Sequence, residues 1–218
     1  MTSPEVTILG IFEDRAQEDF HRGLLTRAAS NLGIGVWLTT RLTKGCRFDY
    51  LREHLEDGYG FSGVVVGVDG KKRRLAEKVR ALEDGVRGIG LTDLPHPLLW
   101  SVASPSIEGW MMADAEALPA VLHEALGTSA RSASRPGRAS SEATAKQRLR
   151  DWTLSLAGRP LLRGGLEYAE EVALRVDVSR VGARRNPDLR HLLETKLPQF
   201  LAECTRGNRG NRPPRGVS

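Results

Sequence analysis

The chain has 218 residues, of which 40% are hydrophobic and 27% are charged, and its formal net charge is +5. This length suits one medium domain with an appendage. The composition excludes a membrane-spanning protein, because no apolar run approaches the roughly 20 residues that cross a bilayer. The N-terminal segment also lacks the basic start and apolar middle of a signal peptide. We therefore expect a cytoplasmic protein with no membrane partner.

The two cysteines, Cys46 and Cys204, stand alone in the sequence. Neither belongs to a paired metal-binding motif, so we expect both thiols to be free in a reducing compartment. The charge is uneven: residues 1–126 hold 14 Lys/Arg and 18 Asp/Glu, whereas residues 127–218 hold 18 and 9. A basic C-terminal part can contact the phosphates of DNA or RNA, although Arg-rich segments often serve only solubility.

Strand and helix patterns alternate through residues 1–126. Apolar and β-branched runs predict strands, and four-residue apolar spacing predicts helices. The predicted strands are 6–12, 35–39, 64–68, a weak one at 88–92, and 98–103. The predicted helices are 16–32, a short one at 48–56, and 71–83. This alternation predicts an α/β fold with a mainly parallel sheet flanked by helices.

The chain changes character after residue 126. Residues 127–145 are rich in Ser, Ala, Arg and Gly, which predicts a flexible linker between an α/β domain at 1–126 and a helical C-terminal region at 146–204. The expected helices of that region are 146–156, 168–178 and 188–204, with Pro198 kinking or splitting the last one. A basic tail at 205–218 is expected to be disordered.

Three acids follow predicted strands: Glu13, Asp69 and Glu108. In a parallel sheet the carboxyl ends of the strands lie on one edge, where such residues converge. Clustered carboxylates repel one another unless a cation compensates them, and hard oxygen ligands favour Mg²⁺ or Mn²⁺. Each acid alone is most often a helix cap or a solvated surface group, so the hypothesis depends on the three together.

Three segments carry a family resemblance. Glu13 to Phe20 follows a strand, Val64 to Gly70 is a strand that ends in Asp69, and the third segment begins at Pro105. Its matching residues are Pro105, Glu108, Trp110, Met111, Met112, Ala113 and Asp114. Over about residues 5–126 the layout resembles a TOPRIM domain, the metal-binding fold of topoisomerases, primases and overcoming-lysogenization-defect (OLD) nucleases. It is most similar to a small bacterial TOPRIM-related family of unknown function.

The resemblance implies a metal-dependent nuclease that acts in bacterial antiviral defence beside an SMC-like or ABC-like ATPase. Under it, Glu13 acts near the metal or as a general base, Asp69 and Glu108 bind the metal, and Asp114 supports these ligands. The sequence contains no phosphate-binding Gly-x-x-x-x-Gly-Lys-Ser/Thr loop, so any ATPase has to be another chain.

Two positions depart from the family pattern. Asp14 stands where the family has Gly, and Lys71 stands where it has the second acid of an Asp-x-Asp pair. A Lys there brings positive charge to the place of a cation ligand. The alternative is therefore a non-cleaving TOPRIM-fold interaction subunit that docks on an ATPase or on nucleic acid. A third interpretation is a doubly wound fold whose acids only cap helices.

Basic residues beside these acids are candidates for phosphate contact. They are Lys71, Lys72, Arg73 and Arg74 after the central strand, and Arg184 and Arg185 in the C-terminal region. Such runs are usually a solvated helix face, but next to a metal site they can hold a substrate's phosphates. His21, in the first predicted helix, is expected at the surface rather than in catalysis.

Overall fold

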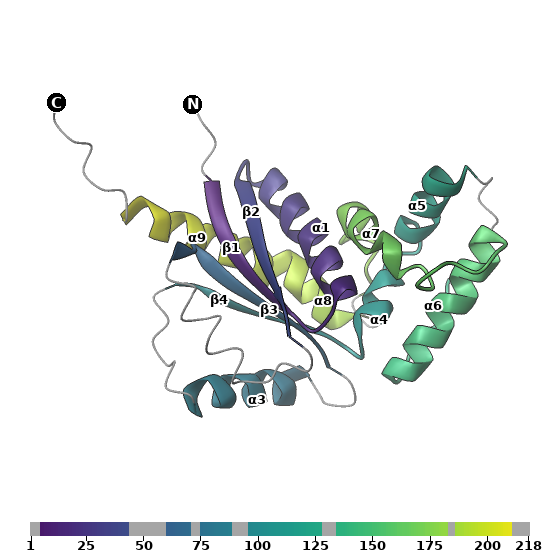
Figure 1. Cartoon of the computed structure of the whole chain (residues 1–218), viewed down its shortest axis with the longest axis horizontal. Helices are drawn as coiled ribbons and strands as arrows, with labels where there is room; N and C mark the ends of the chain where they lie inside the picture. Colours follow the sequence, from purple (N-terminus) through teal and green to yellow (C-terminus); the bar gives the residue numbers. More distant parts are fainter. Residues whose placement is uncertain are drawn as a thin grey trace.

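The computed structural model describes residues 5–43, 60–70, 75–88, 96–127, 134–182 and 186–210. It confirms the predicted α/β fold: four parallel strands form one sheet in the order β2-β1-β3-β4, with helices on both faces (Figure 1). Within this described part, no helix has the length and apolar composition needed to cross a membrane.

The four strands are β1 (Glu5–Phe12), β2 (Gly35–Leu42), β3 (Gly63–Asp69) and β4 (Leu98–Ala103). They confirm the strands predicted at 6–12, 35–39, 64–68 and 98–103. All seven residues of β3 are buried, as the continuous β-branched run indicates for a strand covered on both faces. The helix predicted at 48–56 lies outside the described residues, and so does the strand predicted at 88–92, apart from Gly88.

Helix α1 (Arg15–Asn31) covers one face of the sheet. It begins where the Asp14 carboxylate accepts a hydrogen bond from the backbone N–H of Gln17, and it ends before Gly33, which has a φ of 65°. Its buried apolar residues join the larger of two core clusters. That core also includes side chains from every helix that follows β4.

Helix α3 (Leu75–Gly88) covers the opposite face, where Leu82 and Val86 pack with Val64, Val66 and Val68 in a second core cluster. Side chains that alternate along β3 therefore supply both cores. The predicted helix at 71–83 overlaps α3, while residues 71–74 lie outside the described part.

The helices after β4 build the rest of the larger core. Their bounds are α4 Ile107–Met111, α5 Ala117–Leu126, α6 Glu142–Ala157, the 3-10 turn η2 Leu166–Tyr168, α7 Ala169–Arg175, α8 Pro187–His191, the π-helical turn η3 Leu192–Lys196 and α9 Leu197–Gly210. The interruption predicted near Pro198 takes the form of the π-helical turn η3 directly before α9, and the backbone stays helical from Pro187 to Gly210. Pro198 lies in the first turn of α9. The helix continues through Gly210, beyond the predicted end at 204.

Close packing joins the C-terminal helices to α1. A Cβ added at Gly23 would lie 2.4 Å from the carbonyl oxygen of Glu170 and 2.8 Å from the Cβ of Ala173, both on α7. Only a glycine allows this approach. Leu149 and Trp152 of α6 and Val172 of α7 belong to the same core as the sheet residues.

The predicted linker is only partly described, since residues 128–133 lie outside. In its described part, Arg135 donates a hydrogen bond to the carbonyl oxygen of Ala113 at 2.8 Å, and Ala139 is buried. Arg148 of α6 donates to the carbonyl oxygens of Gly137 and Arg138. The mobility of residues 127–145 stays a prediction.

Candidate functional site

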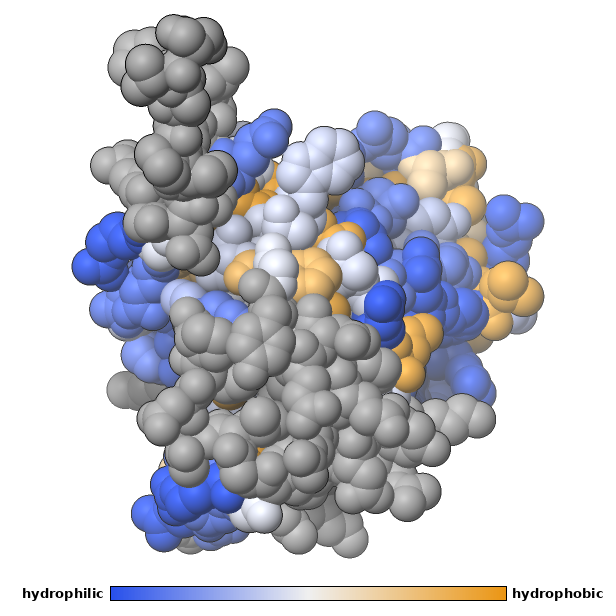
Figure 2. Space-filling view, turned by 60° about the vertical axis from the view of Figure 1, so that its left-hand side comes forward, coloured by the Kyte–Doolittle hydropathy of each residue, from blue (hydrophilic) through white to orange (hydrophobic). Residues whose placement is uncertain are grey.

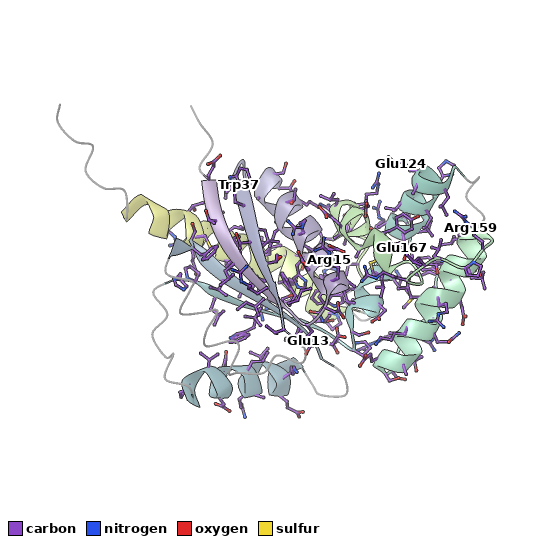
Figure 3. The ribbon with its side chains drawn as sticks, in the orientation of Figure 1. Glu13, Arg15, Trp37, Glu124, Arg159 and Glu167 are labelled. Atoms are coloured by element: carbon purple, nitrogen blue, oxygen red, sulfur yellow. The ribbon has the colours of Figure 1, made fainter. Side chains whose placement is uncertain are left out.

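Three of the predicted acids lie at or just after the carboxyl ends of the strands. Glu13 follows β1, Asp69 ends β3, and Glu108 lies in the first turn of α4, shortly after β4. Figure 3 labels Glu13 just beyond the end of β1. The Glu13 Oε2 atom accepts a hydrogen bond from the backbone N–H of Asp69 at 3.2 Å, and Asp69 Oδ1 accepts one from the backbone N–H of Ile107 at 3.0 Å. We call Glu13, Asp69 and Glu108 the acidic edge.

Burial and the neighbouring carboxylates dominate the electrostatics of Asp69 at the acidic edge. Asp69 is 6% exposed, and its burial, together with the charges of Glu108 and Glu13, raises the pKa of its carboxyl to about 8. Glu108 is 3% exposed, and its Oε2 atom has no hydrogen-bond partner among the described residues. An orphaned buried carboxylate oxygen is costly, so this place favours a cation.

Gln17 is a fourth member of this region that the sequence analysis missed. It is fully buried in the first turn of α1, and its Nε2 donates to Asp69 Oδ1 at 2.8 Å. Its Oε1 has no hydrogen-bond partner among the described residues. The available signal was position: α1 starts directly after β1, so its first turn lies over the same edge of the sheet.

His21 is buried, which corrects the expectation of a surface residue. Its Nδ1 lies 2.6 Å from the carbonyl oxygen of Gln17, and its Nε2 lies 2.7 Å from Ser101 Oγ on β4. Burial lowers the pKa of the ring to about 4, so the ring is neutral at pH 7. Because a carbonyl can only accept, Nδ1 carries the proton and Nε2 accepts from the Ser101 hydroxyl. His21 thus supports the helical turn that presents Gln17.

Asp114, the fourth predicted acid, is engaged elsewhere. It is fully buried, and both of its carboxylate oxygens lie 3.0 Å from Arg180 Nε. Its oxygens also accept the backbone N–H groups of Glu116 at 2.9 Å and Asp177 at 2.8 Å. These contacts join the segment after α4 to the turn after α7. The structure therefore gives Asp114 a structural ion pair instead of a place beside Glu13 and Asp69.

A cation from the C-terminal part lies near the acidic edge. Lys146 of α6 is hydrogen-bonded to Glu142, and this bond raises the pKa of Lys146, with the charges of Glu108 and Asp69 adding to the effect. Nothing in the sequence around Lys146 indicated that it would lie near these acids. The predicted phosphate-contacting residues lie outside the described part: Lys71, Lys72, Arg73, Arg74, Arg184 and Arg185.

The donor chemistry of the acidic edge fits a hard divalent cation. Carboxylate and amide oxygens are the ligands that Mg²⁺ and Mn²⁺ prefer, and Glu108 Oε2 and Gln17 Oε1 are buried without a protein partner within the described ranges. In the same ranges, no three His, Cys, Asp or Glu side chains are grouped closely enough to hold a metal ion as they stand. A cation here would have to draw the carboxylates together.

Comparisons with protein-family models, with curated proteins and with solved structures found no match. The fold itself is clear: an α/β protein with a four-stranded parallel sheet flanked by helices.

Proposed function

We propose that this chain is a TOPRIM-type nuclease that uses Mg²⁺ or Mn²⁺ to cleave phosphodiester bonds in nucleic acid. The observation that supports it most is the burial of Asp69 beside the other acids of the acidic edge. The pKa of Asp69 is raised to about 8 beside two further carboxylates, and Glu108 Oε2 has no partner within the described residues. A buried carboxyl whose pKa is strongly raised beside acids from other segments is typical of a functional site.

Glu13, Asp69 and Glu108 would hold the cation. When bound, it would supply Lewis-acid polarisation of a phosphoryl oxygen and a lowered pKa for a bound water. The chain's own groups prepare the site. The Gln17 amide and the Ile107 N–H fix Asp69 Oδ1, so that its other oxygen keeps a defined direction. Lys146 adds positive charge on the side of α6, which suits an anionic substrate.

The proposal extends to a role in bacterial defence with an SMC-like or ABC-like ATPase. The resemblance of the three motif segments supports this extension. The sequence itself has no nucleotide-binding loop of the P-loop type, so the ATPase would be a separate chain.

The second candidate is an interaction subunit that keeps the fold and does not cleave. Two observations favour it. Asp69 Oδ1 already accepts two hydrogen bonds and Glu13 Oε2 accepts one, so the acids are partly satisfied without a cation. In addition, Lys71 occupies the position of a second acid in the resembled family.

One experiment separates the two candidates. The full chain is incubated with single- and double-stranded DNA and RNA in Mg²⁺, Mn²⁺ or EDTA, and its melting temperature is measured with and without each metal. A ligand bound only by the folded state at 100 times its Kd stabilises that state by about 2.7 kcal/mol. We expect metal-dependent cleavage and a raised melting temperature, and loss of both in Asp69→Asn.

Asp84→Asn is the matched control, because Asp84 is an exposed acid on α3 that should affect neither result. Metal-dependent stabilisation without cleavage of any substrate would favour the interaction subunit. A melting temperature that no divalent metal raises would contradict both metal-binding candidates.

A further inference from the structure

Among the described strands, β2 is an edge strand of the sheet. β2 lies last in the strand order, and no described strand pairs with its outer side. It pairs with β1 in unbroken register from Gly35 to Leu42, so it has no bulge there. Its sequence contains neither Pro nor Lys, and Arg41 is its only charged residue. Bulges, prolines and lysines usually protect the edge strands of monomeric proteins from pairing with another chain. Because β2 has none of these, its outer side is suited to pairing with another strand.

Exposed apolar side chains gather at this edge. Apolar residues reach the surface at several points (Figure 2), and six large ones in the described part are at least 39% exposed. Three of the six lie on β2 or in the turn that leads to it: Leu32, Trp37 and Leu42. Trp37, labelled in Figure 3, is 66% exposed. A solvent-exposed Trp beside unpaired strand backbone is typical of an interaction surface.

The backbone of β2 defines which groups are available. Thr43 donates its N–H to the carbonyl of Phe12 at 2.8 Å, so this odd-numbered position faces β1. Since backbone groups alternate sides along a strand, the even-numbered residues Val36, Leu38, Thr40 and Leu42 direct theirs outward. Consistent with this, the Thr40 carbonyl accepts a hydrogen bond from the guanidinium of Arg41, at 3.1 Å.

We propose that β2 pairs with β2 of a second copy of this chain, antiparallel, with the two-fold axis at Thr39. The outward even-numbered residues then form the hydrogen-bonded pairs, with Val36 opposite Leu42 of the partner subunit. Trp37 lies opposite Arg41 of the partner subunit in a pair without backbone hydrogen bonds, where side chains are closest. The cation and the indole attract each other, and the two-fold axis makes this contact twice. Two four-stranded sheets thereby become one of eight.

The complementarity of β2 with itself is what selects a second copy as the occupant. With the two-fold axis at Thr39, the exposed indole of Trp37 lies opposite the cation of Arg41, and the aliphatic side chain of Val36 lies opposite that of Leu42. This inference does not depend on the proposed nuclease function, because the side chains of Trp37, Thr39 and Arg41 alternate with those on the α1 face and take no part in the acidic edge.

Sedimentation of the full chain over a range of concentrations tests the dimer. We expect twice the chain mass. Trp37→Lys places a Lys opposite Arg41 of the partner subunit and should raise the dimer Kd about tenfold or more. Adding Arg41→Glu to Trp37→Lys restores an opposite-charge pair and should recover most of the affinity. The control is Leu162→Lys, because Leu162 is 93% exposed and remote in sequence from β2, so the Kd should not change.

Disulfide formation tests the register. Thr39→Cys, in a Cys46→Ser background, places two thiols at the axis, where the Cα atoms of such a pair are about 4.5 Å apart, within disulfide range. Trp37→Cys places its thiols about 13 Å apart along the strand, so it should not cross-link. Thr39→Cys should cross-link under mild oxidation.

Three results would overturn the proposal. The first is a monomer at every concentration, which would leave the β2 edge to an extended segment of another protein. The second is a dimer that Trp37→Lys leaves intact. The third is cross-linking of Trp37→Cys in place of Thr39→Cys. Circular dichroism of each variant shows that it has folded, as the exposure of Trp37 leads us to expect.

Discussion

Asp69 and Asp114 are two buried carboxylates in the same core, and their surroundings are opposite. Asp114 faces the guanidinium of Arg180 and two backbone N–H groups. Asp69 faces an amide, one backbone N–H and the charges of two other acids. A buried carboxylate with a cation in the fold is part of the architecture, whereas one without a cation needs a proton or an ion from solution. The contrast separates a structural acid from a candidate functional one.

The largest expected effect concerns the structural acid. Arg180→Met removes the cation that faces Asp114 and leaves a buried charge unpaired, which should lower the free energy of unfolding by about 3 kcal/mol. Urea unfolding measures it. Arg159→Met is the control, since Arg159 is exposed and should change stability little. If both variants were equally stable, Asp114 would not depend on its ion pair, and the contrast would fail.

The next effect concerns Asp69, the candidate functional acid, and has the opposite sign. Folding raises the pKa of Asp69 from 3.8 to about 8, so the folded state holds this proton more tightly than the unfolded state does. The resulting stability is complete below pH 4 and is lost as the pH rises to about 8. Asp69→Asn cannot ionise, and its Oδ1 can still accept from Gln17 and Ile107. We expect it to be more stable than the wild type at pH 8.

Melting temperatures between pH 4 and pH 9, without divalent metal, check this prediction. The wild-type profile should fall across the window more steeply than that of Asp69→Asn. Parallel profiles would show that Asp69 is ionised at little cost, and that its surroundings compensate it as those of Asp114 do.

The smallest effect concerns Gln17. Gln17→Leu removes one of the two hydrogen bonds to Asp69 Oδ1 and should cost about 1 kcal/mol of stability at pH 8. Gln147→Leu is a matched control, because Gln147 Nε2 donates to Asp151 Oδ1 at 2.7 Å in an exposed pair. Urea unfolding of both variants measures the difference. An equal loss in the two variants would show that the buried amide does not support Asp69.

The sequence predicts the strands and the place of Glu13 and Asp69, because apolar periodicity locates strand ends and parallel strands align those ends. It does not predict the partner of Asp114. Arg180 lies 66 positions away, and nothing local indicates which cation packs there. His21 was expected at the surface, since its polar ring follows Phe20 on the helix. The ring is buried because Gly67 leaves space for it, since a Cβ there would lie 2.9 Å from His21 Cε1, and because Ser101 supplies a hydroxyl.

The close approach at Gly23 has an evolutionary consequence. Positions 23 and 173 are a size-matched pair: a larger side chain at one is accepted only if the other side moves away. Moving α7 would shift α1, and with it the turn that carries Asp14 and Gln17. The helices after residue 141 contribute none of the three acids, yet a change where α7 packs on α1 would reach the acidic edge through α1. A lineage that keeps the acids has to keep the small residues where α1 and α7 meet.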